Sequence, residues 1–345
     1  MIYDVIVIGG GQAGLAAGYY LKQKKKNFLI LDERQKTGDS WYHRYDSLVL
    51  FTPKSYSSLP GLDLTGNLQE YPTKNEIAQY LHNYAVHFAL PILHNLKVKQ
   101  LSKDKEDKGF IIQTQIGETY RANQVIVATG GFHNPYTPPI TDAISNDVFQ
   151  IHAVDYRRPS QIPSGKVLVV GAGNTGVQIA SELIETHHVI LSSGKKIKAL
   201  PQTILGNDLF WWLDRFGVLD VKITSKLGQW IKQRDPIIGG DIQKVRKKAS
   251  IRGRLKSVNQ RTAQFENGTE AEVQSIIWAT GYRNHYSWIT INGVLDRNGQ
   301  PIHQRGITNA QGLFFVGLSW QYKRGSALIY GVGEDARFVV DSIGK

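Results

Sequence analysis

The chain contains no cysteine, although it is 345 residues long. Catalysis through a dithiol and a disulfide needs two thiols, so the mechanisms of thioredoxin reductase and glutathione reductase are excluded. Iron–sulfur clusters and structural zinc sites held by thiolates are excluded for the same reason. The histidines show no metal-ligand spacing, and we therefore expect no metal site.

Long apolar runs are also missing. No run approaches the ~20 residues that cross a bilayer, so we expect no integral membrane segment. The first strand pattern begins at Ile2, which leaves no room for a signal peptide ahead of it, and we expect a cytoplasmic protein. The composition, 41% hydrophobic and 20% charged, is typical of a soluble globular protein, and the length suggests about two domains.

Acidic residues are scarce relative to basic ones: 29 against 41, for a formal net charge of +12. Basic residues gather at 22–26 and between 244 and 256. Such clusters can attract nucleic acid or an anionic membrane. The simpler interpretation, which we adopt, is a solvated basic surface that also favours anionic cofactors. We expect no nucleic-acid partner.

Two glycine-rich segments each end an apolar strand pattern: VIVIGGGQAG at 5–14 and VLVVGAGNTG at 167–176. In such a segment the first glycine makes a tight turn, the second lets backbone approach a pyrophosphate, and the third lets helix and strand pack closely. Free N–H groups at the helix start bind the phosphate charge. The expected contacts are Gly9, Gly11, Gln12, Ala13 and Gly14 at one site, and Gly171, Gly173, Asn174, Thr175 and Gly176 at the other. Two such segments predict two nucleotides that exchange electrons.

The residue after the next strand indicates which nucleotide binds the first segment. The strand pattern at 27–31 ends in Asp32 and Glu33. An acid at this position accepts hydrogen bonds from ribose hydroxyls and repels a 2′-phosphate. The first site therefore suits FAD or NAD, with Asp32 as the expected ligand and Glu33 as a neighbour at the surface.

The second site lacks that acid. Its strand at 189–191 is followed by Ser192, Ser193, Gly194, Lys195 and Lys196. Hydroxyl and ammonium groups suit a 2′-phosphate, which predicts NADPH as the coenzyme, with NADH still possible. The alternative is that the two lysines simply belong to the basic surface.

A further pair of segments, IVATG at 126–130 and IWATG at 277–281, closes two apolar strands on Thr-Gly. Backbone must pass close to another group at such a site, so Thr129, Gly130, Thr280 and Gly281 are candidate cofactor contacts. In flavoproteins with two dinucleotides, such segments mark the crossings between the FAD and NADPH domains.

Other motifs extend this pattern: Gly38-Asp39-Ser40-Trp41, then 44–48, 59–61, 71–73, 312–317 and 331–336. With them, the chain resembles the flavin-containing monooxygenase-like proteins over nearly its whole length. The nearest types are short bacterial proteins related to cation-efflux-associated flavoproteins and the plant YUCCA enzymes. The resemblance implies that Ser40 lies along FAD, that Trp41 lies near the flavin, and that Gly317 belongs to the segment covering its pyrimidine end.

The resemblance implies an α/β fold with two Rossmann-like dinucleotide-binding domains, the second inserted into the first. The FAD-binding domain would comprise 1–155 and 280–345, and the NAD(P)H-binding domain 156–279. A helical insert is expected at about 205–240. This insert either covers the substrate entrance or uses its aromatic residues to pack a small core, and we favour core packing for most of them.

The resemblance also implies a reaction. NADPH would reduce the flavin, and a C4a-hydroperoxyflavin formed with O2 would transfer one oxygen atom to a soft sulfur or nitrogen nucleophile. One alternative is a reductase that passes electrons from NADPH to a ferredoxin, a quinone or a metal ion. A redox sensor without turnover is a third. The expected partners are a small-molecule substrate and O2, and a homodimer is possible.

Two departures from the family pattern matter. Of its element FxGxxxHxxxY, only His152 and Tyr156 remain, because Asn146 and Val148 replace the phenylalanine and glycine. The pair is expected to position groups at the domain junction, or simply to brace the linker. Phe51 stands where larger members have asparagine, and a phenyl ring cannot donate an amide hydrogen bond. That change predicts a short-lived hydroperoxyflavin and release of hydrogen peroxide.

Overall fold

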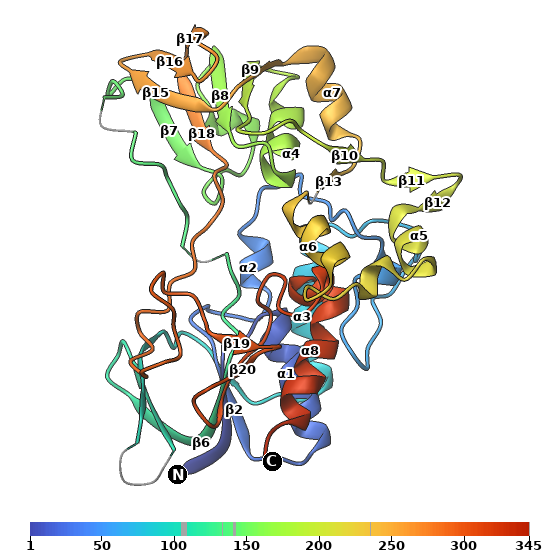
Figure 1. Ribbon diagram of the computed structural model, residues 1–345, viewed down its shortest axis with the longest axis vertical. Helices are drawn as coiled ribbons and strands as arrows, with labels where there is room; N and C mark the ends of the chain where they lie inside the picture. Colours follow the sequence, from blue (N-terminus) through green and yellow to red (C-terminus); the bar gives the residue numbers. More distant parts are fainter. Residues whose placement is uncertain (105–108, 133, 141–142, 235, 345) are drawn as a thin grey trace.

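The computed structural model describes residues 1–104, 109–132, 134–140, 143–234 and 236–344. The chain forms two α/β units, each built on its own sheet, with two crossing segments between them (Figure 1). The first and last parts of the chain share one unit, and the middle part forms the other. The predicted α/β fold with two Rossmann-like units is confirmed.

The sheet of the first unit is centred on β1 (Ile2–Ile8), which pairs in parallel with β2 (Phe28–Leu31) and β6 (Thr119–Val127). Strand β2 and the last residues of β1 and β6 are apolar and buried, because helices pack on one face of the sheet and β4, β5 and residues 286–294 pack on the other. The order is β19-β20-β21-β6-β1-β2-β3, and β5 joins β4 to β6. The remaining strands are β3 (Ile92–Leu93), β4 (Val98–Lys103), β5 (Phe110–Thr114), β19 (His303–Gln304), β20 (Ile307–Thr308) and β21 (Leu313–Phe315).

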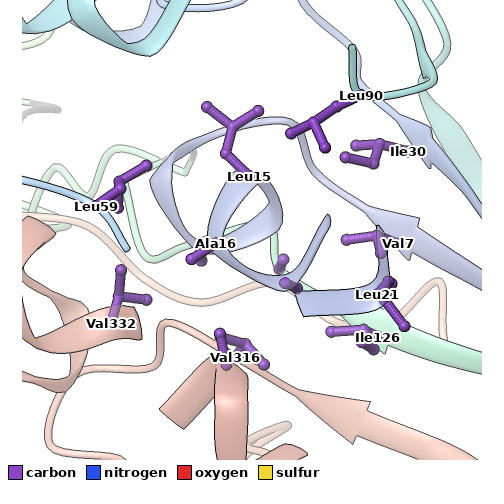
Figure 2. Packing of buried hydrophobic residues seen from close by; sticks show 14 of the residues in the cluster. Val7, Leu15, Ala16, Leu21, Ile30, Leu59, Leu90, Ile126, Val316 and Val332 are labelled. Atoms are coloured by element: carbon purple, nitrogen blue, oxygen red, sulfur yellow. The ribbon is translucent and has the colours of Figure 1, made fainter. Parts of the chain in front are cut away.

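Helix α1 (Gln12–Gln23) lies at the centre of the first unit's core. Figure 2 shows Leu15, Ala16 and Leu21 of this helix among side chains of the sheet and of the C-terminal segment. Helix α3 (Lys74–His87) begins with a capping box in which Thr73 and Glu76 each bond the other's backbone N–H. The last helix, α8 (Ile329–Asp341), packs along α1 with its first residues near the turn between β1 and α1 and with Asp341 paired to Lys24, just after the end of α1.

The second unit has a parallel sheet in the order β14-β9-β8-β18-β7. Helices α4 (Asn174–Leu183) and α7 (Asp241–Lys248) pack on each other beside it. The strands are β7 (Phe149–His152), β8 (Lys166–Val170), β9 (His188–Ser192), β14 (Ser250–Arg252) and β18 (Ser275–Trp278). A separate antiparallel sheet contains β15 (Leu255–Asn259), β16 (Thr262–Phe265) and β17 (Glu270–Glu272).

The boundary between the units lies earlier than the expected residue 155. Strand β7 pairs in parallel with β18, Phe149 against Ser275 and His152 against Trp278, so it belongs to the second sheet. Residues 144 and 145 already pair with Gln260 of the second unit. The four residues of β7 carry no pattern of their own that assigns them to one sheet or the other, and only the pairing does so.

Residues 199–238, hereafter the insert, leave the second unit and reach over the first (Figure 1). They contain the strand pair β10 (Ala199–Leu200) and β13 (Ile237–Ile238), the hairpin β11 (Thr203–Ile204) and β12 (Asn207–Asp208), and the helices α5 (Leu209–Arg215) and α6 (Lys226–Gln233). Leu209 and Phe210 of α5 pack with Phe51 and Tyr56 of the first unit. Across the described ranges, none of the helices is both long and apolar enough to span a bilayer.

Candidate dinucleotide sites and their junction

The first glycine segment forms the turn from β1 into α1, and its glycines have different surroundings. Gly9 has φ +109°, and a Cβ there would lie 2.5 Å from the carbonyl oxygen of Ala128. A Cβ on Gly14 would lie 1.8 Å from the carbonyl oxygen of Gly9. At Gly11, by contrast, no described atom other than those of its chain neighbours lies within 4 Å of the Cβ position. The backbone is therefore tight at the first and third glycines and open at the second, which is the space a pyrophosphate needs.

Asp32 is fixed against this turn. The Gly10 N–H donates to Asp32 Oδ2 at 2.6 Å, and the Arg34 N–H donates to Oδ1 at 2.7 Å. Burial raises the pKa of Asp32, and these two N–H groups act in the opposite direction. Glu33 instead lies at the surface, within 3.6 Å of Lys97 Nζ. Of the two acids, Asp32 is the one held at the nucleotide turn.

The C-terminal segment closes the first site from the other side. Gly317 has φ +84°, and a Cβ there would lie 2.6 Å from the Cβ of Ala13. The side-chain amide of Gln12 donates to the carbonyl oxygen of Ala327 at 2.8 Å. Ala327 ends a short 3-10 helix (Arg324–Ala327) just before α8. Residues more than 300 positions apart therefore meet at the start of α1.

The residues expected near the flavin lie on short elements of the first unit. Trp41 is half-buried in α2 (Asp39–Tyr42), where it packs against the core, and Ser40 is exposed. Phe51 is also half-buried, but its ring stacks on Phe210 of the insert, with centroids 6.0 Å apart and 22° between the planes. Sequence reasoning did not pair these two rings, because 158 residues and a change of unit separate them.

The second glycine segment repeats the geometry of the first. Gly171 has φ +110° with its Cβ position 2.3 Å from the carbonyl oxygen of Ala279, and the Cβ position of Gly176 is 1.9 Å from the carbonyl oxygen of Gly171. Gly173 again has no described atom within 4 Å. Asn174 has a structural task as well, since its Oδ1 accepts a hydrogen bond from the Ile238 N–H at 3.1 Å and so holds the end of the insert. Thr175 follows it in the first turn of α4, half-buried.

A recess of about 310 Å³ lies beyond β9, at the residues expected to select the coenzyme. Its lining comprises Ser193, Lys195, Lys196, Ile197, Arg246, Ile251 and Arg252. The sequence pattern after β9 does not predict the two arginines, Arg246 and Arg252. They come from the basic stretch at 244–256, and the pairing of Arg252 with Ser192 in neighbouring strands brings that stretch to the recess. Four cationic side chains and a hydroxyl therefore surround a space with no acid in its lining.

Ser192, in contrast, does not line the recess. Its hydroxyl donates to the carbonyl oxygen of Gly253 at 2.9 Å and accepts from the Leu255 N–H at 3.0 Å. The residue is only 2% exposed. Ser192 ends the strand, as expected, but its side chain braces the chain at 253–255.

The two Thr-Gly segments lead into crossings that bond to each other. The Tyr136 N–H donates to the Gly281 carbonyl oxygen at 3.0 Å, and the Arg283 N–H donates to the Asn134 carbonyl oxygen at 2.8 Å. The Thr280 hydroxyl donates to the carbonyl of Tyr136. Each crossing also starts beside a nucleotide turn, since Ala128 touches Gly9 and Ala279 touches Gly171. The hydrogen bonds between the crossings therefore fix the positions of the two glycine turns relative to each other.

His152 lies at the junction of the units. Burial lowers the pKa of His152, so the ring is neutral near pH 7, and its Nδ1 accepts from the Val154 N–H at 3.1 Å. The ring meets Tyr282 edge-on at 5.6 Å, and the Tyr282 hydroxyl accepts from Arg44 Nη1 at 3.2 Å. This chain of contacts runs from the second unit to the first and suits a positioning role.

Tyr156 lies deeper. It is fully buried, and its hydroxyl donates to Glu182 Oε2 of α4 at 2.8 Å. Burial raises the pKa of Tyr156 further above its ordinary value. The side chain therefore braces the second unit. Beside it, the hydroxyl of Tyr45 from the first unit donates to Gln178 of α4, which fixes the two units together.

Comparison with known proteins agrees with this geometry. The family model described as pyridine nucleotide-disulphide oxidoreductase matches residues 6–209, more than half of the chain. An uncharacterised CzcO-like oxidoreductase of Geobacillus kaustophilus is 50% identical, over 99% of this chain and 98% of its own length. The chain belongs to this oxidoreductase family. Because it has no cysteine, the disulfide chemistry in the family's name is not available to its own side chains.

Other relatives connect the oxidoreductase to flavin enzymes. A flavin-containing monooxygenase structure from Stenotrophomonas maltophilia superposes with a TM-score of 0.85 at 26% identity, covering 99% of this chain and 98% of that one. A probable indole-3-pyruvate monooxygenase of Arabidopsis thaliana, YUCCA1, is 28% identical over 100% of this chain and 90% of its own length. The predicted resemblance to flavin monooxygenase-like flavoproteins, and the expectation of an oxidoreductase, are confirmed.

Replacing Gly11 tests the first site of the oxidoreductase. Gly11 has φ −78° and ψ −171°, which any residue adopts, and its Cβ position is open. Gly11→Val should therefore fold normally but lose bound FAD, because the side chain would occupy the path of the pyrophosphate. The measurement is the FAD-to-protein ratio after purification, with unfolding followed alongside.

Gly14→Ala is the matched control. Its Cβ would meet the Gly9 carbonyl, so this variant should lose stability even without FAD. Stoichiometric FAD in Gly11→Val would count against the assignment.

Replacing Lys195 and Lys196 with alanine tests the second site. Both line the recess, and loss of charge-assisted contacts to a 2′-phosphate should cost roughly 1.5–3 kcal/mol of binding free energy. The KM for NADPH should rise while that for NADH stays nearly unchanged. Lys244→Ala with Lys247→Ala is the control, since both lie on α7 outside the lining of the recess. An equal rise in KM for both coenzymes would contradict a role of these lysines in binding the 2′-phosphate.

Proposed function

We propose that the protein is an FAD- and NADPH-dependent monooxygenase that transfers one oxygen atom of O2 to a soft sulfur or nitrogen nucleophile of a small molecule. FAD binds at the first turn and NADPH at the second. Part of the NADPH oxidation is uncoupled and yields hydrogen peroxide. The observation that carries the proposal is the repeated turn geometry, tight at Gly9 and Gly171 and open at Gly11 and Gly173, with the crossings between the two turns.

The residues present fit these cofactors. The open Cβ positions leave room for two pyrophosphates, Asp32 is held where a ribose would lie, and the recess at Lys195 and Lys196 suits a 2′-phosphate. When bound, FAD supplies hydride acceptance and the activation of O2. The side chains are left with binding, alignment and exclusion of water, and the paired crossings with the Arg44–Tyr282–His152 contacts fix the alignment.

The insert supplies a cover. Phe210 stacks on Phe51 and lies 5.9 Å from the ring of Tyr330, while Tyr56 lies 6.0 Å from Phe210. These rings form an apolar layer between the insert and the first unit, and Phe51 of this layer stands where larger flavin monooxygenases have a side-chain amide. Such a layer excludes water but donates no amide hydrogen bond, which is the basis of the proposed uncoupling.

The ratio of hydrogen peroxide to oxygenated product tests this proposal. With an alkyl aryl sulfide present, the wild-type protein should still release a substantial share of its NADPH electrons as hydrogen peroxide. Phe51→Asn should lower that share by restoring a donor. Phe216→Asn, which changes an exposed ring of the insert, should leave it unchanged.

The unfolding of both variants must be measured alongside. The half-buried ring should cost less than the about 3–5 kcal/mol of a fully buried phenylalanine. Tight coupling in the wild type would contradict the proposed role of Phe51.

A reductase that delivers electrons to a ferredoxin, a quinone or a metal ion is the second candidate, and the same ring favours it. Because Phe51 offers no amide to stabilise a flavin peroxide, the same residue is compatible with a flavin that passes its electrons to an acceptor and transfers no oxygen atom. NADPH consumption that produces reduced acceptor without oxygen, and no sulfoxide in air, would decide for the reductase.

A further inference from the structure

The outer side of the insert carries large apolar side chains in contact with solvent. Leu205, at the tip of the β11–β12 hairpin, is 86% exposed, and Phe216, at the end of α5, is 72% exposed. Trp211 is 42% exposed. Together with the half-buried Ile204 and Trp212, these residues form what we call the tip patch. Exposed apolar groups that gather in one place mark a surface that binds something.

The tip patch is one continuous surface. Trp212 Nε1 donates to the Ile204 carbonyl oxygen at 2.8 Å, which joins α5 to the hairpin. The Trp212 ring then meets Trp211 edge-on at 4.7 Å and stacks on Phe216 at 5.8 Å. In Figure 1 the hairpin and α5 lie together at the outer edge of the molecule.

The acidic groups of the same elements face the other way. Asp214 of α5 accepts from the Tyr56 hydroxyl at 2.9 Å, and Asp208 accepts from the Tyr71 hydroxyl at 2.5 Å. Both bonds reach into the first unit. A helix on the surface of a soluble domain usually turns its charge outward and its aromatic residues inward. Here Trp211 and Phe216 are exposed, while both carboxylates are hydrogen-bonded to tyrosines of the first unit.

The hairpin tip shows the same departure. Leu205 has φ +49° and Gly206 has φ +80°, a two-residue turn at which asparagine followed by glycine is the preferred pair. A leucine in this conformation is strained, and it is almost fully exposed. Neither folding nor solubility explains an apolar side chain there.

The insert also carries exposed basic residues, of which Arg215 adjoins Phe216 of the tip patch. Arg215, Lys222, Lys226 and Lys232 of the insert are exposed, and none has a carboxylate within ion-pair distance among the described residues. Asp220 is occupied by Lys323 of the first unit at 2.8 Å, and Asp235 lies outside the described residues. The whole chain adds a formal net charge of +12. Exposed tryptophan, phenylalanine and leucine beside lysine and arginine is the composition that binds the interface of anionic lipids.

We infer that the insert docks the protein peripherally on an anionic lipid surface, with the tip patch entering the headgroup region and the basic side chains on the lipid phosphates. A second copy of the chain is a poorer occupant. A symmetric contact would bring Arg215 of both copies and two net charges of +12 together. The seven-residue α5 and its hairpin are also small against the ~800 Å² that each partner of a stable dimer contributes. The inference does not depend on the proposed reaction.

Vesicle co-sedimentation of the FAD-loaded protein tests the inference. The wild type should bind phosphatidylcholine vesicles that contain phosphatidylglycerol and bind much more weakly to phosphatidylcholine alone. Raising the salt from about 0.1 M to 1 M should weaken binding, because the screening length falls from ~10 to ~3 Å. Trp211→Ser combined with Phe216→Ser should lower the partition coefficient at least about tenfold, since two insertable rings are lost. Arg215→Gln with Lys226→Gln should lower binding only to the anionic vesicles.

Matched variants elsewhere on the chain are the controls. Val86→Ser with Ile116→Ser removes two apolar side chains that are each 66% exposed, and Lys25→Gln with Lys99→Gln removes two exposed charges. Both pairs lie in the first unit and should leave vesicle binding unchanged. NADPH oxidation without lipid should also be unchanged in every variant.

Three results would overturn the inference. One is that the wild type fails to bind anionic vesicles at low salt. Another is that the control pairs lower vesicle binding as much as the patch pairs. Binding would then depend on the total charge and apolar surface of the protein, and not on the tip patch. The third is that, without lipid, sedimentation velocity finds a dimer that Trp211→Ser with Phe216→Ser dissociates, which would assign the tip patch to a second copy.

Discussion

Backbone-to-backbone contact at the two glycine turns is the constraint on which the rest of the structure depends. At Gly9 and Gly171 the chain passes so close to Ala128 and Ala279 that no side chain fits, and each of those alanines begins a crossing between the units. The place of each proposed nucleotide site, the direction of each crossing and the separation of the two sites are therefore set by the same few contacts. A side chain at either glycine would displace a crossing as well as a turn.

Much of this arrangement can be predicted from the sequence because its causes are local. Few local structures require glycines at this spacing directly after an apolar strand. Both turns, and Asp32 as the acid beside the first, could therefore be assigned from the residues alone. Contacts made by tertiary pairing could not. Arg252 reaches the recess only because β14 pairs with β9, and Phe210 meets Phe51 only because the insert folds back across the first unit. The place of Ser192 at the end of the strand follows from the sequence, whereas the inward direction of its hydroxyl depends on the chain at Gly253 and Leu255.

The insert is the part of the molecule that does the most to distinguish it from two joined nucleotide domains. Its inner side closes an aromatic layer over the first unit, held by Asp208, Asp214 and Lys323 with Asp220. Its outer side presents aromatic residues and cations to the surroundings. One short segment therefore has one side in the aromatic layer and the other side exposed to the surroundings.

The central claim is that the two turns hold two nucleotides placed to exchange a hydride. Anaerobic titration of the purified, FAD-containing protein with NADPH, followed by the visible absorbance of the flavin, tests it most directly. The account predicts that one equivalent of NADPH bleaches the flavin fully, and that NADH does so far more slowly at the same concentration. A flavin that stays oxidised in excess NADPH, while the protein demonstrably binds the coenzyme, would contradict it.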